Sequence, residues 1–244
     1  MWNTYWSNYD PNTIYTSSAA VPAPTTQTLN WNTHCPLYGK IGFTAISQCN
    51  AFGAGLGYGN RGIFPVTALT KRHGYMRGHG NGGGEAGQRV WFCDANNQIV
   101  EMTVLDAKVR YSYNPTRDYC IVLFSADLPS DRIPPLLVGS YPRPHQAVCF
   151  TTHQMGRIDA NIPPFSFDDR SKPRFNDVAI GIDGDSGSPY LQVTTDGRLV
   201  FVGGATTTGP CPQMQADMDF LCTNQVPPLD IHSYQMTYAT GWPR

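Results

Sequence analysis

A serine flanked by glycines, in residues 184–189 (GDSGSP), is the segment of this chain best suited to nucleophilic chemistry. The hydroxyl of Ser186 is a weak nucleophile near neutral pH, so it needs an imidazole to take its proton and a group to orient that imidazole. The flanking glycines let the backbone approach a substrate carbonyl, and the amides of Gly184 and Ser186 could donate to a developing oxyanion. The segment predicts acyl transfer, although the tetrapeptide Gly-Asp-Ser-Gly within it also occurs in ordinary turns.

Two histidines upstream could supply the imidazole, because His73 and His79 both lie in residues 69–79 (LTKRHGYMRGH). Asp118 could orient one of them, since it opens the uninterrupted apolar run 119–124 (YCIVLF). A buried carboxylate there would accept from the imidazole Nδ1 and stabilise the imidazolium formed during attack. Aspartate also precedes strands for local hydrogen-bonding reasons alone. The nearby alternatives are Asp106, Asp127 and Asp131, none of which begins such a run.

Together these segments resemble the chymotrypsin-like serine protease family. In the register of that resemblance, His79 is the general base, Asp118 its partner and Ser186 the nucleophile, while His73 takes a structural position and remains the runner-up base. The order histidine, aspartate, serine separates the chain from subtilisin-type enzymes and from α/β-hydrolases. The match around His79 is loose, because residues 77–78 are Arg-Gly where the family has a small pair, and Gly80 replaces a common cysteine.

The resemblance implies an all-β fold of two six-stranded antiparallel Greek-key β-barrels, with the active site at their interface. Residues 1–38 are expected to form an N-terminal extension, 39–135 the first barrel and 136–244 the second. The proline-rich residues 133–144 would connect the barrels. His79 and Asp118 then belong to the first barrel and Ser186 to the second.

Hydrophobic alternation and turn residues predict the strands that must hold these side chains. Asn96 and Asn97 predict a turn, and the pair 196–197 predicts a hairpin. No window shows a sustained helical stripe of apolar residues. The glycine-rich residues 80–87 are expected to form a mobile loop beside the substrate cleft. The expected strands are 40–47, 63–69, 89–93, 99–113, 146–152, 190–194 and 199–205.

Composition narrows the classes of function. With 244 residues, 41% of them hydrophobic, the chain can bury a substantial core. Only 14% of residues are charged, and 24 Gly and 20 Pro favour strands joined by turns. The net charge of −1, without a block of like charges, argues against nucleic acid or an anionic membrane as partner. No apolar run approaches the roughly 18 residues needed to span a bilayer.

Residues 1–33 lack the basic head and apolar middle of a secretory signal. By analogy with exported proteases we expect a secreted or extracytoplasmic protein whose signal is not part of this chain, and a viral source stays open. A monomer is favoured.

Seven cysteines leave at least one unpaired if all pairing is internal. Cys35 is close enough to Cys49 to clamp a loop, and Cys211 to Cys222, whereas Cys120 and Cys149 lie in apolar runs and are expected to be buried thiols. None has the Cys-x-x-Cys spacing of a zinc or redox site, so no metal and no cofactor are expected.

Substrate preference follows only from the resemblance. The base of the P1 pocket, six residues before the nucleophile, would be Ile180, and residues 201–206 resemble a pocket wall. An apolar P1 residue is therefore expected, although Asp183 could supply charge in another register. No Ile-Val-Gly-Gly start is visible, so Asp185 needs a different partner from the one in trypsin-type enzymes. The proposed wall residues are Gly203, Gly204, Ala205 and Thr206.

The sequence thus predicts a serine endopeptidase acting on a protein or peptide. One alternative is an inactive protease homologue that binds a protein or glycan. Another is a structural β protein in which the three motifs are coincidental.

Overall fold

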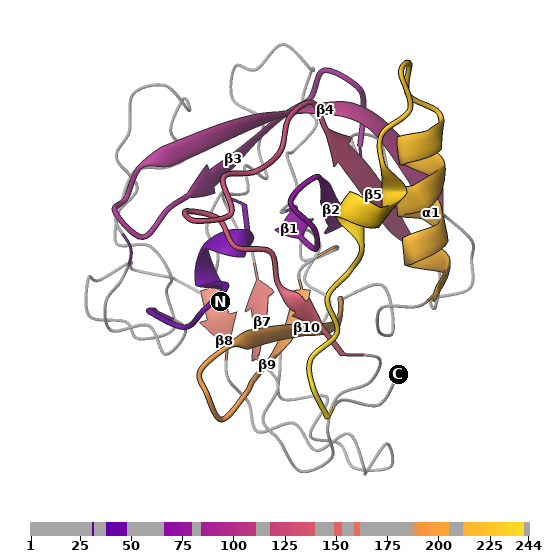
Figure 1. The fold of residues 1–244 in the computed structure, drawn as a ribbon. Helices are drawn as coiled ribbons and strands as arrows, with labels where there is room; N and C mark the ends of the chain where they lie inside the picture. The colour runs from indigo at the N-terminus through magenta and orange to yellow at the C-terminus, as the bar shows by residue number, and fades with distance from the viewer. Residues whose placement is uncertain are drawn as a thin grey trace.

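The structure of the chain is a computed structural model that describes residues 31, 38–47, 66–79, 84–110, 118–139, 149–152, 159–161, 187, 189–204 and 212–241. This part of the chain is mostly β, with two five-stranded sheets and one α-helix (Figure 1). The predicted all-β character is confirmed at this coarse level.

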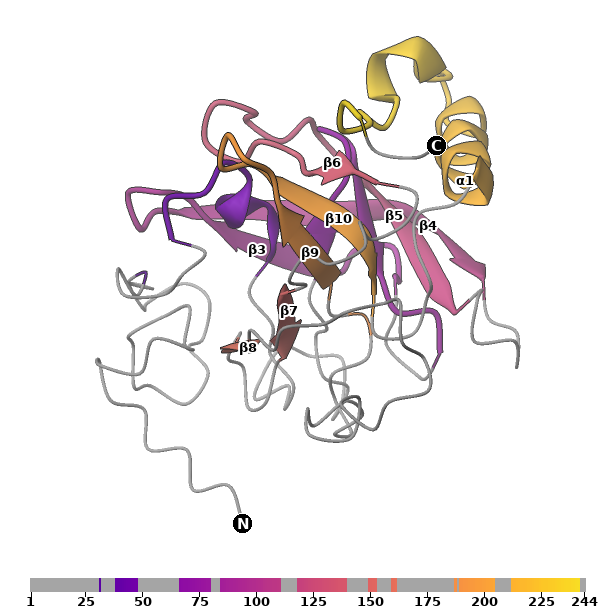
Figure 2. The same cartoon turned by 90° about the horizontal axis from the view of Figure 1, so that it is seen from below.

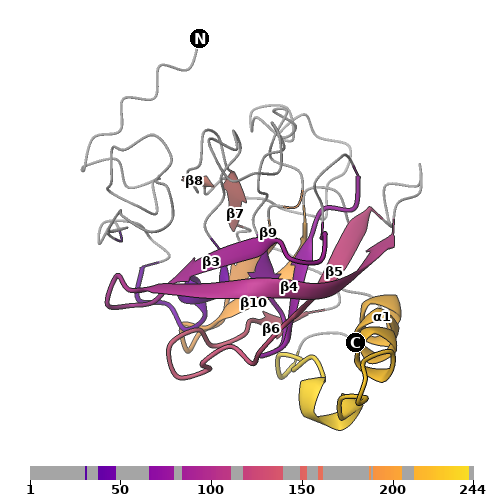
Figure 3. The same cartoon turned by 90° about the horizontal axis from the view of Figure 1, so that it is seen from above.

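The first sheet is antiparallel throughout and has the order β1-β2-β5-β4-β3. The long strand β4 pairs with β3 along its first half and with β5 along its second, with a bulge between Val104 and Asp106. A bulge increases the local twist of a sheet, and this sheet is curled and not flat (Figure 3). Its strands are β1 (Thr67–Ala68), β2 (His73–Met76), β3 (Arg89–Cys93), β4 (Ile99–Arg110) and β5 (Tyr119–Phe124).

The second sheet has the order β6-β10-β9-β7-β8, in which only the β6–β10 pair is parallel. The hairpin β9–β10 follows the sequence prediction, with Gly197 of its turn at φ 80°. Its strands are β6 (Leu137–Val138), β7 (Cys149–Thr152), β8 (Asp159–Asn161), β9 (Pro189–Val193) and β10 (Leu199–Gly204). Two six-stranded barrels are not confirmed in the described ranges.

Residues 40–47 were expected to form a strand and do not. Gly42 lies in the left-handed region at φ 96°, which ends an extended segment, and the 3-10 helix η1 (Phe43–Ala45) follows. Single bridges join Ile41 to Arg198 and Ile46 to Thr67. The segment therefore connects the two sheets instead of extending either one.

The α-helix α1 (Pro212–Thr223) was not predicted. It packs on β4 and β5 (Figure 2) and is followed by the 3-10 helix η4 (Ile231–Tyr234). Its buried positions have helical spacing, but one of them is the acid Asp217, which interrupts the apolar pattern. This polar residue on the buried face explains why the helical stripe escaped sequence analysis. The buried residues are Met214, Asp217, Met218, Leu221 and Cys222.

One hydrophobic core joins the two sheets. The rings of Tyr75 in β2 and Phe201 in β10 lie 4.9 Å apart between centroids. Trp31 is also buried in this core, where its indole nitrogen donates to Asp94 O at 2.7 Å and its ring meets Phe43 edge-on. At least one aromatic residue of the predicted extension therefore packs against the body.

Three cysteines whose side chains the structure describes are buried thiols that form no disulfide: Cys93, Cys120 and Cys222. The expected buried thiol at Cys120 is confirmed, and burial raises its pKa to about 12. The suggested pairing of Cys211 with Cys222 is wrong in this structure, because the Cys222 thiol faces the core from α1. Cys35, Cys49, Cys149 and Cys211 have side chains outside the described residues. No helix in the described ranges is long and apolar enough to cross a membrane.

Candidate active site

The ends of two neighbouring strands bring the histidine and the aspartate together. Strands β2 and β5 are antiparallel, with Met76 opposite Cys120. The residues just after β2 therefore lie beside the residue just before β5. His79 follows β2 in the chain and Asp118 immediately precedes β5.

His79 and Asp118 form a hydrogen bond between Nδ1 and Oδ2. The other carboxylate oxygen accepts from the Gly78 backbone N–H at 3.1 Å. Because an ionised carboxylate can only accept, Nδ1 carries the proton, and in a neutral imidazole Nε2 then has the lone pair. The Asp118 side chain is 12% exposed, whereas the His79 side chain is 29% exposed. The carboxylate is thus held inside, and the imidazole reaches toward the surface.

Gly78 makes this pairing sterically feasible. A Cβ atom at residue 78 would lie 2.6 Å from Tyr119 O, 2.7 Å from Arg110 O and 2.8 Å from Tyr119 N. All three are backbone atoms of the last pair in the β4–β5 ladder, so they have little room to move. The strand end can approach closely enough for its amide to reach Asp118 only because residue 78 has no side chain.

Gly187, which follows the predicted nucleophile, approaches the same strand end. Gly187 has φ 86°, and a Cβ on it would lie 2.6 Å from the backbone nitrogen of Arg77. The residue directly after Ser186 is therefore in close backbone contact with the residue two positions before His79. Ser186 itself, together with Gly184, Ile180, Ala205 and Thr206, lies outside the described residues.

The two described residues of the proposed pocket wall lie at the end of β10. Gly203 has φ 145° beside an irregularity in the β9–β10 register. A Cβ on Gly204 would lie 2.1 Å from the hydroxyl oxygen of Tyr75, four residues before His79. Strands β10 and β2 are thus in direct contact through Tyr75.

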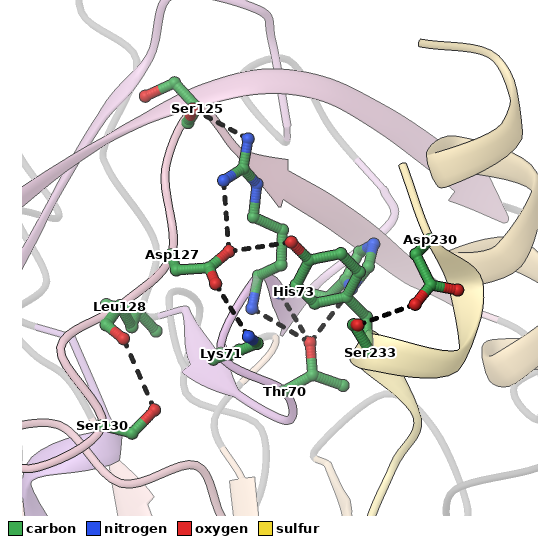
Figure 4. A network of polar contacts seen from close by, with 11 residues as sticks. Thr70, Lys71, His73, Ser125, Asp127, Leu128, Ser130, Asp230 and Ser233 are labelled. Atoms are coloured by element: carbon green, nitrogen blue, oxygen red, sulfur yellow. Dashed lines mark hydrogen bonds and ion pairs between the residues drawn. The ribbon is translucent and has the colours of Figure 1, made fainter. Parts of the chain in front are cut away.

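The runner-up base, His73 (Figure 4), is fully buried and pairs with Leu123, near the opposite end of β5 from Asp118. The Thr70 hydroxyl oxygen accepts from the amides of Arg72 and His73, so its own hydrogen is available for His73 Nδ1 at 3.0 Å. Nε2 then donates to Cys222 Sγ at 3.6 Å. Burial, with a smaller contribution from the charge of Arg72, lowers the pKa of His73 to about 3. This geometry is that of a neutral structural histidine.

The alternative carboxylates have other partners. Asp127 accepts from Lys71, Arg72 and Tyr234 and ties η4 to the turn before β2 (Figure 4). Burial tends to raise the pKa of Asp127, but these hydrogen bonds outweigh it and lower the pKa below its usual range. Asp106 accepts from Ala107 N and Gln225, and Asp131 is exposed.

Sequence reasoning missed a cluster of polar side chains that forms around Asp217, close to Asp118. Arg110 and Tyr119, which form the last pair of the β4–β5 ladder, both donate to Asp217 of α1. The only sequence signal of this cluster was an acidic residue, Asp217, at helical spacing among apolar residues. That pattern is recognisable only once the helix is known. These residues are considered further below.

Solved structures include chains with structural similarity to this one. No family model and no curated protein sequence matches the chain. Among solved structures, it is similar to the scabies mite inactivated protease paralogue S-D1, with 11% identity and a TM-score of 0.47. The alignment covers 69% of this chain and 83% of that one.

The buried His73 predicts a specific loss of stability in acid. An unfolded histidine binds a proton below pH 6.5, but folded His73 does so only near pH 3, so the unfolded state binds more protons between these values. Stability should therefore fall by about 1.4 kcal/mol for each pH unit lost within this window. In His73→Gln that contribution is absent. Urea unfolding from pH 7 to pH 4 should give converging free energies for the two proteins, and parallel profiles would contradict the assignment.

Substituting Gly78 should separate His79 from Asp118. Gly78→Ala introduces a methyl group against three backbone atoms, and such overpacking typically costs about 1–3 kcal/mol. We expect both a lower unfolding free energy and loss of the low-field proton resonance of His79 Nδ1–H. Gly39→Ala is the control, because nothing lies within 4 Å of a Cβ there and only its φ of 73° is unfavourable. A Gly78→Ala protein that keeps the resonance would refute the steric argument.

Proposed function

We propose that the chain is a serine-type endopeptidase. Ser186 attacks the scissile carbonyl, His79 takes the proton and returns it to the leaving amine, and Asp118 orients His79. The amides of Gly184 and Ser186 stabilise the oxyanion. The observation that carries the proposal is the His79–Asp118 hydrogen bond, formed where the backbone of residue 187 meets Arg77. A buried, doubly hydrogen-bonded carboxylate behind a part-exposed imidazole is the arrangement that general-base activation of a serine requires.

The hydrogen bonding supports the direction of proton transfer. With Nδ1–H directed at Asp118, the lone pair of the neutral imidazole is on Nε2, the nitrogen farther from the carboxylate. When Nε2 accepts the serine proton, the resulting imidazolium is in contact with the Asp118 carboxylate, which stabilises the positive charge. The Gly78 amide keeps the carboxylate from turning away.

A protein or peptide is the proposed substrate, in an extracytoplasmic setting. Gly203 and Gly204 present a strand end without side chains, and residues 205–206 would continue this wall. Ile180 would make the floor of the P1 pocket apolar. Without an acidic floor, Lys and Arg are poor P1 residues.

The nucleophile assignment predicts a specific covalent modification. The wild-type protein should react with a fluorophosphonate probe at Ser186, as read by mass spectrometry of the labelled peptide. Ser186→Ala should keep its fold and lose the label. His79→Ala should lower the labelling rate by at least about 10³-fold, since triad members act as a unit.

His73→Gln is the matched control, because it alters a histidine six positions away that does not contact Asp118. It should leave the labelling rate close to that of the wild type when both are folded. A folded wild-type protein that does not label at all would refute the endopeptidase. An inactive homologue that binds a protein or glycan would then be the better reading.

The proposed pocket predicts cleavage after apolar residues. A peptide library digested with the wild-type protein should show large or medium apolar side chains at P1, with Ser186→Ala as the blank. Because an unpaired charge in an apolar pocket is strongly disfavoured, cleavage after Lys or Arg should be rarer by at least about tenfold. A profile dominated by Lys or Arg would refute the assignment of Ile180.

A further inference from the structure

A buried carboxylate lies behind the proposed active site, on an element far away in the sequence. Asp217 in α1 is 1% exposed. It accepts from Arg110 Nη2 at 2.7 Å and from Arg110 Nε at 3.1 and 3.2 Å, which makes a two-pronged ion pair. It also accepts from the Tyr119 hydroxyl at 2.9 Å and from Gln213 at 3.2 Å. All of these donors converge on one carboxylate.

Outside α1, Asp217 accepts hydrogen bonds from Arg110 and Tyr119, and both residues lie close to Asp118. Arg110 and Tyr119 are opposite each other in the last pair of the β4–β5 ladder, and Tyr119 is the next residue after Asp118. Their backbone atoms are also those against which Gly78 lies. The position of the Asp118 carboxylate, and of the amide that binds it, therefore depends on where this ladder pair sits.

The contacts differ from those that would merely attach a helix to a sheet. Apolar residues of α1, including Met214, Met218 and Leu221, already bury the helix in the core. A charged residue taken out of water in such a face is costly unless it is paired and hydrogen-bonded, as Asp217 is. The tyrosine hydroxyl fixes the direction of the Tyr119 side chain, and the Arg110 fork fixes the opposite strand.

We propose that Asp217 is a positioning residue for the His79–Asp118 pair, acting through Tyr119 and Arg110. It touches neither the imidazole nor the proposed substrate. It holds the final pair of the β4–β5 ladder so that Asp118 meets both Gly78 N and His79 Nδ1. The part of this inference that concerns reaction rate rests on the proposed endopeptidase, whereas the part that concerns the hydrogen bond of His79 does not.

The experiment measures the tautomer of His79 and the labelling rate of Ser186 separately. In protein labelled with nitrogen-15 histidine, long-range proton–nitrogen spectra show which ring nitrogen of His79 carries the proton, with His79→Gln used for assignment. Wild type should show Nδ1 protonated, at a pH where the imidazole is neutral. Asp217→Asn and Tyr119→Phe should each shift His79 toward the mixture of tautomers found in a free imidazole. Fluorophosphonate labelling of Ser186 should slow by about 10- to 10²-fold, as expected for a misplacement of 1 Å or less.

Asp219→Asn is the matched control. It removes the same charge from the same helix, but Asp219 accepts from Gln215 and Gln235 rather than from the β4–β5 ladder. It should leave both the spectrum and the labelling rate unchanged. The double variant Asp217→Asn, Tyr119→Phe should lose less than the product of the two single effects, because both substitutions remove the same contact.

The outcomes separate the positioning role from the enzyme. If folded Asp217→Asn and Tyr119→Phe keep the wild-type His79 spectrum, the positioning role is wrong, even when the helix is less stable. If the spectrum changes but the wild type never labels, the positioning role stands and the endopeptidase fails. If labelling occurs and slows only in proportion to the unfolded fraction, Asp217 is a stabilising residue alone and the proposal is overturned. Tyr119→Phe, which removes a single hydroxyl, keeps the test valid should Asp217→Asn not fold.

Discussion

The contact between the end of β2 and the end of the β4–β5 ladder is the constraint on which the candidate site depends. At Gly78 two backbones approach with no side chain between them, so the amide of one segment and the carboxylate of the other come within hydrogen-bonding distance. Asp118 then has both oxygens occupied, one by Gly78 and one by His79. A buried carboxylate with fixed partners can orient an imidazole at little further entropic cost. Geometry of this kind must be provided by the fold, since neither residue could impose it alone.

Residues in and next to the second sheet also approach β2 closely. The close approach of Gly187 to Arg77 and of Gly204 to Tyr75 means that β2 and the residue after it are bordered by both Gly187 and the end of β10. Glycine recurs at these approaches for one reason, which is that backbone must lie against backbone or against an aromatic ring. The Tyr75–Phe201 contact makes the same boundary continuous with the core. The surroundings of His79 are thus assembled from both sheets.

Local patterns were sufficient for some elements and failed for others. The short apolar run at 89–93, the turn at Asn97 and the apolar run 119–124 identified β3, β4 and β5 because these are local patterns within one strand or hairpin. The expectation of a strand at residues 40–47 was wrong because a single glycine with positive φ, Gly42, interrupts the extended backbone despite several strand-forming neighbours. Helix α1 was missed because Asp217 is buried by partners that lie about a hundred residues earlier in the chain. His73 and His79 could not be separated by residue type; burial, which is a property of the folded chain, distinguishes them. The roles of His79, Asp118 and Ser186 stay a prediction.

The position of α1 in the chain bears on how the molecule forms during synthesis. This helix follows every strand of both sheets, yet it covers β4 and β5 of the first one. The first sheet is therefore translated early but cannot bury its outer apolar surface or pair Arg110 until residues 212–223 have left the ribosome. Long-range contacts of this kind slow folding and leave a partly covered sheet exposed in the meantime. The chain consequently completes the neighbourhood of His79 only after residues 212–223 have been made, so that a nascent product truncated before this helix would lack a finished site.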